Sequence, residues 1–295
     1  MSARFLTVVL ERAFNMRDGF GREIDYMRIS VIDSCNLNCY YCNPCDNNEH
    51  CHALNILSVK EVLCIVRAAT RLGIKHFRLT GGEPLLHPQL DEMVLQIKKI
   101  PGVSSVSLTT NAVLLAQHAK WLKEAGIDSI NVSLDTIDAS EYERITKKPL
   151  LEEVKHGINA AIECGIRVKI NVVLTPQTDV VALTRYVAKK GTDIRFIEMM
   201  PVGEGHTNGV EPYKKVIGTL SKLYGEPCRI NTEKTKEINS ENDKRKIPDN
   251  GPAEYYIFPE LGIRVGLIQA IHGKFCDTCN RIRVTADGRL MPCLG

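Results

Sequence analysis

Short runs of β-branched and aromatic residues alternate with longer amphipathic stretches over the first two thirds of the chain. The short runs predict six strands, at 26–32, 75–81, 103–111, 129–135, 166–174 and 192–200. The stretches between them predict helices, for example over 58–72, where Ser58 is the expected N-cap, and over 88–99. Six strand–helix units in a row favour a parallel sheet with right-handed crossovers. Since a closed barrel of this type needs eight units, we expect an α/β fold with a partial (βα)6 TIM-like barrel that is open on one side.

The alternation stops after residue 225. Residues 226–251 are polar and rich in charge, which favours an exposed excursion. From Gly251 onward, "GPAEYYIFPELGIRVGLI" predicts strands and turns. We therefore divide the chain into an N-terminal extension (1–17), a partial barrel (18–225) and a C-terminal segment (226–295).

The composition is that of a globular protein. With 44% apolar and 25% charged residues, the 295-residue chain is unlike disordered or collagen-like sequences. Its net charge of +3 does not require nucleic acid or a membrane as a partner, although a local group of arginines can still bind an anion. No apolar run reaches the ~18 residues that span a bilayer, and "FLTVVL" near the start is too short for the core of a signal peptide. We expect a cytoplasmic protein.

Six of the eleven cysteines form two tight groups, spaced C-x3-C-x2-C and C-x2-C-x13-C. They are Cys35, Cys39 and Cys42 in the first group and Cys276, Cys279 and Cys293 in the second. In a cytosolic protein such groups favour metal or redox chemistry over disulfides. The first group follows the first predicted strand, where barrel enzymes carry their chemistry. A structural zinc site needs four ligands, whereas three cysteines on a four-iron cluster leave one iron open for another ligand.

The main alternative is a zinc or cluster site, built from some of these cysteines, that only ties the C-terminal segment to the barrel. This alternative fits the second group better, because C-x2-C is common in zinc folds and the first spacing is not. Among the other cysteines, Cys64 and Cys164 lie in helical apolar patterns and are expected to be buried thiols. Cys45 and Cys51 are not assigned as ligands.

The first group resembles the signature of radical S-adenosylmethionine (SAM) enzymes. In that family the amino and carboxylate groups of SAM chelate the open iron of a [4Fe–4S] cluster, and the reduced cluster splits SAM into methionine and a 5′-deoxyadenosyl radical. The resemblance continues in "LTGGEP" (79–84), which matches the segment that lines the SAM amino group; glycines there allow a close backbone approach. The SAM contacts that the resemblance implies are Tyr41, Gly81, Gly82, Glu83, Ser133 and Met200.

Further stretches are similar to the MoaA family, the GTP 3′,8-cyclases of molybdenum cofactor biosynthesis, over residues 18–295. They are "GREIDYMRIS", "TTN", "NVSLD", "RFIEMMPVG", "GPAEYY" and "CDTCNRIRVTADGRLMPCL". The resemblance implies a lyase with a second [4Fe–4S] cluster, held by the C-terminal cysteines, whose open iron contacts guanine. It also implies the product, (8S)-3′,8-cyclo-7,8-dihydroguanosine 5′-triphosphate, formed after the radical abstracts the ribose C3′ hydrogen and C3′ attacks guanine C8. The implied GTP contacts are Arg28, Arg78, Thr109, Lys169, Arg195, Arg281 and Arg283.

These contacts agree with the chemistry of a triphosphate, which needs several fixed cations and suits arginine. Arg281 and Arg283 stand two residues apart, so an extended backbone would aim both the same way. His76 stands where the family commonly has lysine, which replaces a permanent cation by a titratable imidazole. We expect weaker phosphate binding, or a different anion, for that reason. His87, beside Pro88 at a helix start, is expected to be structural.

Two other interpretations stay open: a radical SAM enzyme with an auxiliary cluster that modifies a peptide or another small substrate, and a non-catalytic, metal-stabilised binding module. The paired arginines favour a nucleoside triphosphate over a peptide. Expected partners are GTP and an electron donor, and a homodimer is compatible with the sequence.

Both ends of the printed chain differ from the family. The family usually continues to a Gly-Gly tail, and the chain stops at Gly295, so we expect SAM cleavage with poor cyclisation. The family tends to begin just before Gly21 and Arg22, which makes Met16 an alternative start.

Overall fold

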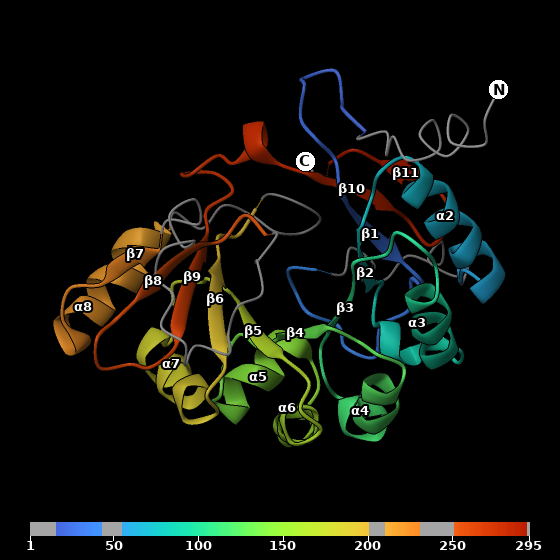
Figure 1. The fold of residues 1–295 in the computed structure, drawn as a ribbon. Helices are drawn as coiled ribbons and strands as arrows, with labels where there is room; N and C mark the ends of the chain where they lie inside the picture. The colour runs from blue at the N-terminus through green and yellow to red at the C-terminus, as the bar shows by residue number, and fades with distance from the viewer. Residues whose placement is uncertain (1–15, 43–54, 201–209, 231–250, 294–295) are drawn as a thin grey trace, which may run out of the picture.

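The described residues of the computed structural model (16–42, 55–200, 210–230 and 251–293) build an eleven-stranded sheet with helices on its outer face (Figure 1). Six parallel strands in chain order make up its centre. They are β1 (Tyr26–Ser30), β2 (His76–Thr80), β3 (Ser105–Thr110), β4 (Ser129–Ser133), β5 (Val168–Val173) and β6 (Asp193–Ile197). The strand order runs linearly from β11 to β7, so the curled sheet is open. The predicted α/β partial barrel is confirmed.

The helices follow the strands and cover one face of the sheet (Figure 1). They are α2 (Val59–Arg71), α3 (Leu90–Lys98), α4 (Leu115–Glu124), α5 (Ala139–Thr146), α6 (Leu151–Glu163), α7 (Val180–Lys189) and α8 (Gly218–Tyr224), with shorter turns η1 (Pro84–Leu86) and η2 (Tyr213–Ile217). As predicted, Ser58 caps α2: its hydroxyl accepts from Glu61 N at 3.3 Å, and the Glu61 carboxylate accepts from Ser58 N at 2.8 Å. The core lies between sheet and helices, where Leu79, Leu108 and Val66 are fully buried.

The C-terminal segment adds strands to both edges of this sheet. On one side β9 (Arg264–Ile268) pairs with β6 in parallel, and β8 (Glu254–Ile257) and β7 (Cys228–Ile230) continue antiparallel. On the other side β10 (Arg281–Val284) pairs with β1 in parallel, followed by β11 (Leu290–Met291). The sequence did not predict this arrangement. The predicted excursion begins with edge strand β7, and residues 231–250 lie outside the described residues.

Two predictions about single residues had different outcomes. His87 is structural, because it is buried, its Nε2 donates to Leu57 O at 2.9 Å and its Nδ1 accepts from Gln89 N at 3.1 Å. The prediction that Cys64 and Cys164 are buried is wrong: Cys64 is exposed and Cys164 is half-buried. The buried face of α2 includes Val62 and Val66, and Cys64 lies between them on the solvent side. No helix in the described ranges is long and apolar enough to cross a membrane.

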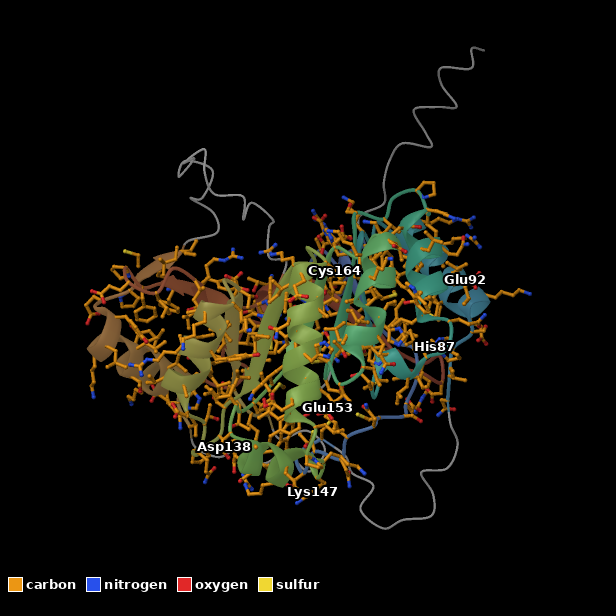
Figure 2. All side chains as sticks on the ribbon, turned by 90° about the horizontal axis from the view of Figure 1, so that it is seen from below. His87, Glu92, Asp138, Lys147, Glu153 and Cys164 are labelled. Carbon is orange, nitrogen blue, oxygen red and sulfur yellow. The ribbon has the colours of Figure 1, made fainter. Side chains whose placement is uncertain are left out.

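The end of α5 has a strained residue. Lys147, exposed at the surface (Figure 2), has a left-handed backbone with φ of 60°, while its N–H donates to Glu143 O at 2.8 Å. A side chain in this region costs about 1–2 kcal/mol relative to an ordinary helical conformation. Glycine is the usual residue at such a helix end.

Replacing Lys147 with glycine is expected to raise the free energy of unfolding by about 0.5–1 kcal/mol, because the relief of strain exceeds the added entropy of the unfolded chain. Urea unfolding of the metal-free protein measures this change. The matched control is Lys148→Gly, at an exposed neighbour without a positive φ, which is expected to lower stability by about 0.5 kcal/mol. Equal effects of the two substitutions would contradict the assignment of strain to Lys147.

Candidate active site

The first cysteine group lies on the loop that leaves β1, at the carboxyl edge of the parallel strands. The loop rests on the end of α5, where Asn38 N donates to Thr146 O at 3.0 Å and Tyr40 N donates to Ile145 O at 3.1 Å. Cys42 N closes a turn on Cys39 O at 3.0 Å. The cysteines of this group are free thiols, so the loop is held by backbone hydrogen bonds and not by a disulfide.

The three thiols of this group suit a cationic cluster. Partial removal from solvent raises the pKa of Cys35, Cys39 and Cys42, and Asp135 and the neighbouring thiolates raise the pKa of Cys39 further, to about 12. The thiols therefore stay protonated until a cation replaces their protons. No three His, Cys, Asp or Glu side chains in the described part of the chain converge on a single metal ion. The ligands of an iron–sulfur cube each bind a different iron, so they do not need to converge on one metal ion.

The "GGE" segment after β2 runs directly against the start of the cysteine loop. Gly82 N donates to Ile32 O and Glu83 N to Ser34 O, both at 2.7 Å. A Cβ on Gly81 would lie 2.3 Å from Ile32 O, and one on Gly82 would lie 2.2 Å from Ser34 O. The approach therefore requires glycine at both positions.

The Glu83 carboxylate forms its hydrogen bonds within the protein. It is 1% exposed and accepts from Thr110 Oγ1 at 2.7 Å, Asn111 N at 2.7 Å and Leu85 N at 3.0 Å. Burial raises its pKa although these hydrogen bonds act in the opposite direction. The side chain thus joins the end of β3 to the end of β2, and the predicted contact of this segment with SAM stays a prediction.

The other predicted SAM contacts lie at the same edge of the sheet. The Tyr41 hydroxyl donates to Asp135, whose second oxygen accepts from Val173 N at 2.7 Å. Burial raises the pKa of Asp135 to about 6. Ser133 is exposed at the end of β4, and Met200 is half-buried shortly after β6. The sequence had not singled out Asp135, although it ends the quoted "NVSLD".

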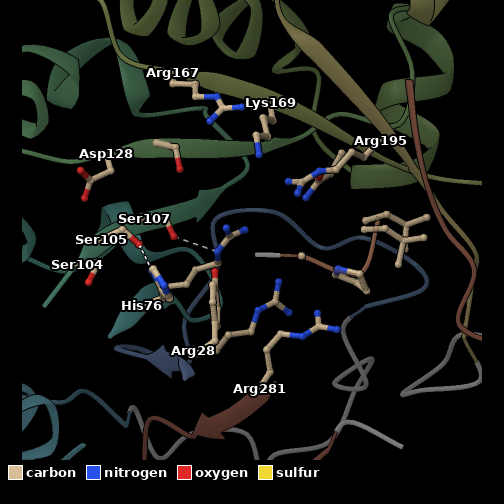
Figure 3. A pocket seen from close by; sticks show the side chains of 18 residues that line it. Arg28, His76, Ser104, Ser105, Ser107, Asp128, Arg167, Lys169, Arg195 and Arg281 are labelled. Carbon is tan, nitrogen blue, oxygen red and sulfur yellow. Dashed lines mark hydrogen bonds between the residues drawn. The ribbon is translucent and has the colours of Figure 1, made fainter. Parts of the chain in front are cut away.

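A cavity of about 320 Å³ lies inside the barrel (Figure 3). Five of the seven predicted GTP contacts line it, and these are Arg28, Arg78, Lys169, Arg195 and Arg281. Arg283 and Thr109 are not among its lining residues. The Thr109 hydroxyl is nevertheless buried and has no hydrogen-bond partner among the described residues.

Three arginines stand side by side on adjacent strands of the sheet, and two of them, Arg28 and Arg78, line the cavity. The register pairs Arg283 with Arg28 and Arg28 with Arg78, across β10, β1 and β2. Burial, and then the charges of the neighbouring arginines, lower the pKa of Arg28 to about 9. Its Nε is buried without a hydrogen-bond partner in the part of the chain that the structure describes. Like charges at adjacent strand positions repel, so a bound anion would relieve this wall.

The opposite wall adds two buried cations, Lys169 at 4% and Arg195 at 3% exposure. Arg195 Nε donates to Asn171 Oδ1 at 2.9 Å. Arg78 Nε donates to Ser107 Oγ at 3.1 Å. The sequence analysis missed Asn171 and Ser107, which are the register neighbours of Arg195 and Arg78. Their position as small polar residues on otherwise buried strands could have indicated from the sequence that they contact other polar groups.

His76 lies in the same cavity but contributes no fixed charge. Its Nδ1 bonds with Ser105 Oγ at 2.8 Å, and its ring stacks on Tyr26 with 6.3 Å between centroids. Burial lowers its pKa below the ordinary value of histidine. The imidazole is therefore neutral at pH 7.

The second cysteine group is divided by strands β10 and β11: Cys276 and Cys279 precede β10, and Cys293 follows β11. Cys276 opens the turn η3 (Cys276–Thr278), and Arg22 Nη1 donates to Cys276 O at 2.6 Å. The guanidinium of Arg22 also interacts electrostatically with Cys279, and that of Arg283 with Cys279 and Cys293. Two cations thus stand beside these thiols. Cys45 and Cys51 lie outside the described residues, so their roles stay open.

The chain segment that precedes the second cysteine group is held by a buried carboxylate. Glu198, after β6, is 4% exposed and accepts from Ile271 N at 2.7 Å and from His272 N at 3.1 Å. Directly after Cys279, Asn280 Nδ2 donates to Asp25 Oδ1 at 2.6 Å. None of these anchors was identified from the sequence.

Comparison with known proteins decides the family. Residues 29–183 match the Radical SAM superfamily, and residues 192–295 match Molybdenum Cofactor Synthesis C. A GTP 3′,8-cyclase of Clostridium perfringens (strain SM101 / Type A) is 37% identical over 282 residues, which are 95% of this chain and 83% of the relative. One of Pelotomaculum thermopropionicum is 38% identical over 283 residues, 95% of this chain and 84% of the relative. The chain belongs to the GTP 3′,8-cyclase family of radical SAM enzymes.

Solved radical SAM structures share the fold of this GTP 3′,8-cyclase family member. SuiB of Streptococcus suis superimposes with a TM-score of 0.65 at 14% identity, covering 92% of this chain and 60% of SuiB. Methylornithine synthase (PylB) gives a TM-score of 0.54 at 16% identity, covering 77% of this chain and 70% of that protein. At these identities the likeness concerns the fold alone.

Gly266 allows Arg195 to reach the cavity. The two residues are register neighbours, and a Cβ on Gly266 would lie 2.8 Å from Arg195 Cγ and 3.0 Å from the Tyr255 ring. Gly266→Ala is therefore expected to displace Arg195 and to weaken binding of inorganic triphosphate about tenfold, the effect of one lost charged hydrogen bond. Isothermal titration calorimetry measures this affinity. Gly218→Ala, at a helical position with no atom within 4 Å of the added carbon, serves as the control and should leave binding unchanged. Unchanged affinity in Gly266→Ala would show that Arg195 does not contact the anion.

Proposed function

We propose that this chain is a GTP 3′,8-cyclase, a lyase that converts GTP to (8S)-3′,8-cyclo-7,8-dihydroguanosine 5′-triphosphate in molybdenum cofactor biosynthesis. The observation that carries the proposal is the cavity, which six lysine and arginine side chains line, one of them on β10, the strand that follows Cys279. Relatives named for this activity, at 37–38% identity over 95% of the chain, support it.

Two [4Fe–4S] clusters belong to the proposal. Cys35, Cys39 and Cys42 hold the first, which binds SAM, and Cys276, Cys279 and Cys293 hold the second. When bound, the first cluster and SAM supply the 5′-deoxyadenosyl radical that takes the ribose C3′ hydrogen. An external electron donor reduces the first cluster. The residues assigned to SAM are Tyr41, Gly81, Gly82, Glu83, Ser133 and Met200, of which Tyr41 is fixed by Asp135.

The chain's own part in catalysis is to orient the nucleotide. Arg28, Arg78, Lys169 and Arg195 bind the triphosphate, because their charges surround one cavity and those of Lys169 and Arg195 are buried. Arg281 and Arg283 follow Cys279 on β10, so they direct the nucleotide towards the second cluster. The buried hydroxyl of Thr109, which has no hydrogen-bond partner among the described residues, is left to bond with the substrate. Holding both ends of GTP places C3′ and C8 for ring closure without a further catalytic side chain.

The alternative of a peptide-modifying enzyme has less support. SuiB, which has been solved bound to the precursor peptide SuiA, resembles this chain only in its fold, at 14–15% identity. A row of neighbouring arginines inside a partial barrel suits a polyanion and has no evident use for an extended peptide.

The decisive assay combines reconstituted protein, SAM, dithionite and GTP without oxygen. We expect 5′-deoxyadenosine and the cyclised nucleotide to form together. Cys279→Ala is expected to keep 5′-deoxyadenosine formation, to lose the cyclised product and to reduce the iron content from about eight to about four per chain, because only the second cluster is lost. The sequence alone predicts SAM cleavage with poor cyclisation. If the unmodified chain makes 5′-deoxyadenosine but no cyclised nucleotide, the radical SAM assignment therefore stands, and the proposed cyclisation of GTP by this chain fails.

The neutral imidazole of His76 limits affinity for the triphosphate. His76→Lys is expected to bind GTP about tenfold more tightly at pH 7, because it adds one permanent charged hydrogen bond. Burial lowers the pKa of His76, so the unmodified protein gains this charge, and the affinity, only as the pH falls below the ordinary range of histidine. Titration calorimetry at several pH values tests both expectations. His76→Asn, measured at the same pH values, is the control: its pH dependence shows the contribution of the nucleotide's own protonation. An identical pH dependence in His76→Asn would refute the role of the imidazole.

A further inference from the structure

Asn111 contacts the first cysteine group from the end of β3. Its Nδ2 donates to Asn36 Oδ1 at 2.7 Å and lies 3.8 Å from Cys35 Sγ, within hydrogen-bonding distance of sulfur. Neither the sequence resemblance nor the proposed substrate contacts give this residue a role.

The orientation of the Asn111 amide is fixed by its neighbours. Val113 N–H can only donate, and it donates to Asn111 Oδ1 at 3.0 Å. The NH2 group must therefore face the other way, towards Asn36 and Cys35. Turning the amide over would place two donors against each other at Val113 and two acceptors at Asn36.

The backbone around Asn111 is equally restrained. Asn111 N donates to the buried Glu83 carboxylate at 2.7 Å. The next residue, Ala112, is fully buried with φ of 65°, and its N–H donates to Thr110 Oγ1 at 2.9 Å. A Cβ added to Gly157 on α6 would lie 2.4 Å from Ala112 O, so the turn packs tightly on that helix. A left-handed conformation at a residue with a side chain is retained only where the surroundings enforce it.

We propose that Asn111 donates a hydrogen bond to the Cys35 thiolate that holds the first cluster, and thereby makes this cluster easier to reduce. The inference rests on the proposed function, because it assumes a cluster on Cys35, Cys39 and Cys42. The cluster gains one electron from the external donor, and the added negative charge spreads over its sulfur ligands. A donor aimed at one of these sulfurs stabilises the reduced state more than the oxidised state and raises the reduction potential. Asn111 is thus a positioning residue that acts through Cys35.

The test is a redox titration of the first cluster, followed by electron paramagnetic resonance in the full-length Cys279→Ala background, where the second cluster is absent. Asn111→Ser removes the donor, stays neutral, and keeps a hydroxyl that can accept from Val113 N–H. At a fixed solution potential, its ratio of reduced to oxidised cluster is expected to fall about tenfold, as for the loss of one hydrogen bond to a charged group.

Asn36→Ala is the matched control. It removes the other partner of the same NH2 group and leaves the contact with Cys35, so its ratio is expected to stay within about twofold of the parent, because only the neutral partner is lost. If Asn111→Ser does not retain a cluster, Asn111→Asp is measured in its place. It keeps the shape and the bond from Val113 but sets a carboxylate against the sulfur, and its ratio is expected to fall further.

The outcomes separate the two proposals. An unchanged ratio in an Asn111 variant that carries the cluster overturns the inference and leaves the proposed function intact. An equal fall in Asn36→Ala and Asn111→Ser also overturns it, because the effect would then come from the position of the loop. If the parent protein binds no iron on its first cysteine group, the proposed function fails, and the inference fails with it.

Discussion

The parallel pairing of β10 with β1 is the constraint on which the site depends. These strands come from opposite ends of the chain, and their register puts Arg283 beside Arg28 and Arg281 beside Tyr26. Ile282 and Val284 alternate with the two arginines and are buried, so apolar burial on one face fixes a strand whose other face carries charge. The same strand brings the second cysteine group to the barrel. Without this pairing the cavity would lose Arg281 and a wall, and the two cysteine groups would belong to unconnected segments.

The two halves of the site have opposite electrostatic needs. In the metal-free state, the first cysteine group holds protons that only a cation can replace, because burial and mutual repulsion raise the thiol pKa values. The arginine row has the opposite problem, since burial and like charges lower the pKa of Arg28. Each half is therefore an unfavourable arrangement that its own ligand relieves, iron in one case and a polyanion in the other. Ligands that bind only the folded state also stabilise it, so binding offsets the unfavourable free energy of the empty site.

Much of this organisation was visible in the sequence, and the failures have physical reasons. Local patterns predicted the six strands and the Ser58 cap because periodicity and capping act over a few residues. The alternation of Arg281 and Arg283 predicted that they share a face, but no local pattern says which strand lies next to them. Partner choice in a parallel sheet is set by the whole fold. Cys64 was wrongly predicted to be buried because it was counted as apolar, although Val62 and Val66 already defined the inner face of α2. The sequence assigned Glu83 to SAM, which stays a prediction, but it did not predict that the Glu83 carboxylate joins two strand ends.

Strand β2 connects the two halves mechanically. It carries Arg78 in the cavity and leads, three residues later, into Gly81 at the cysteine loop. At about 3.3 Å per residue, the two positions are about 10 Å apart along a rigid, paired strand. Gly82 and Glu83 bind the loop backbone directly, so the loop cannot shift relative to the arginines without breaking these bonds. If Arg78 binds the phosphates as proposed, the substrate has to extend from there towards the cysteine loop to present a reacting carbon. That requirement favours an elongated molecule with its charge at one end, which is the shape of a nucleoside triphosphate. The requirement depends on backbone distances, so a side-chain substitution in the cavity does not change it.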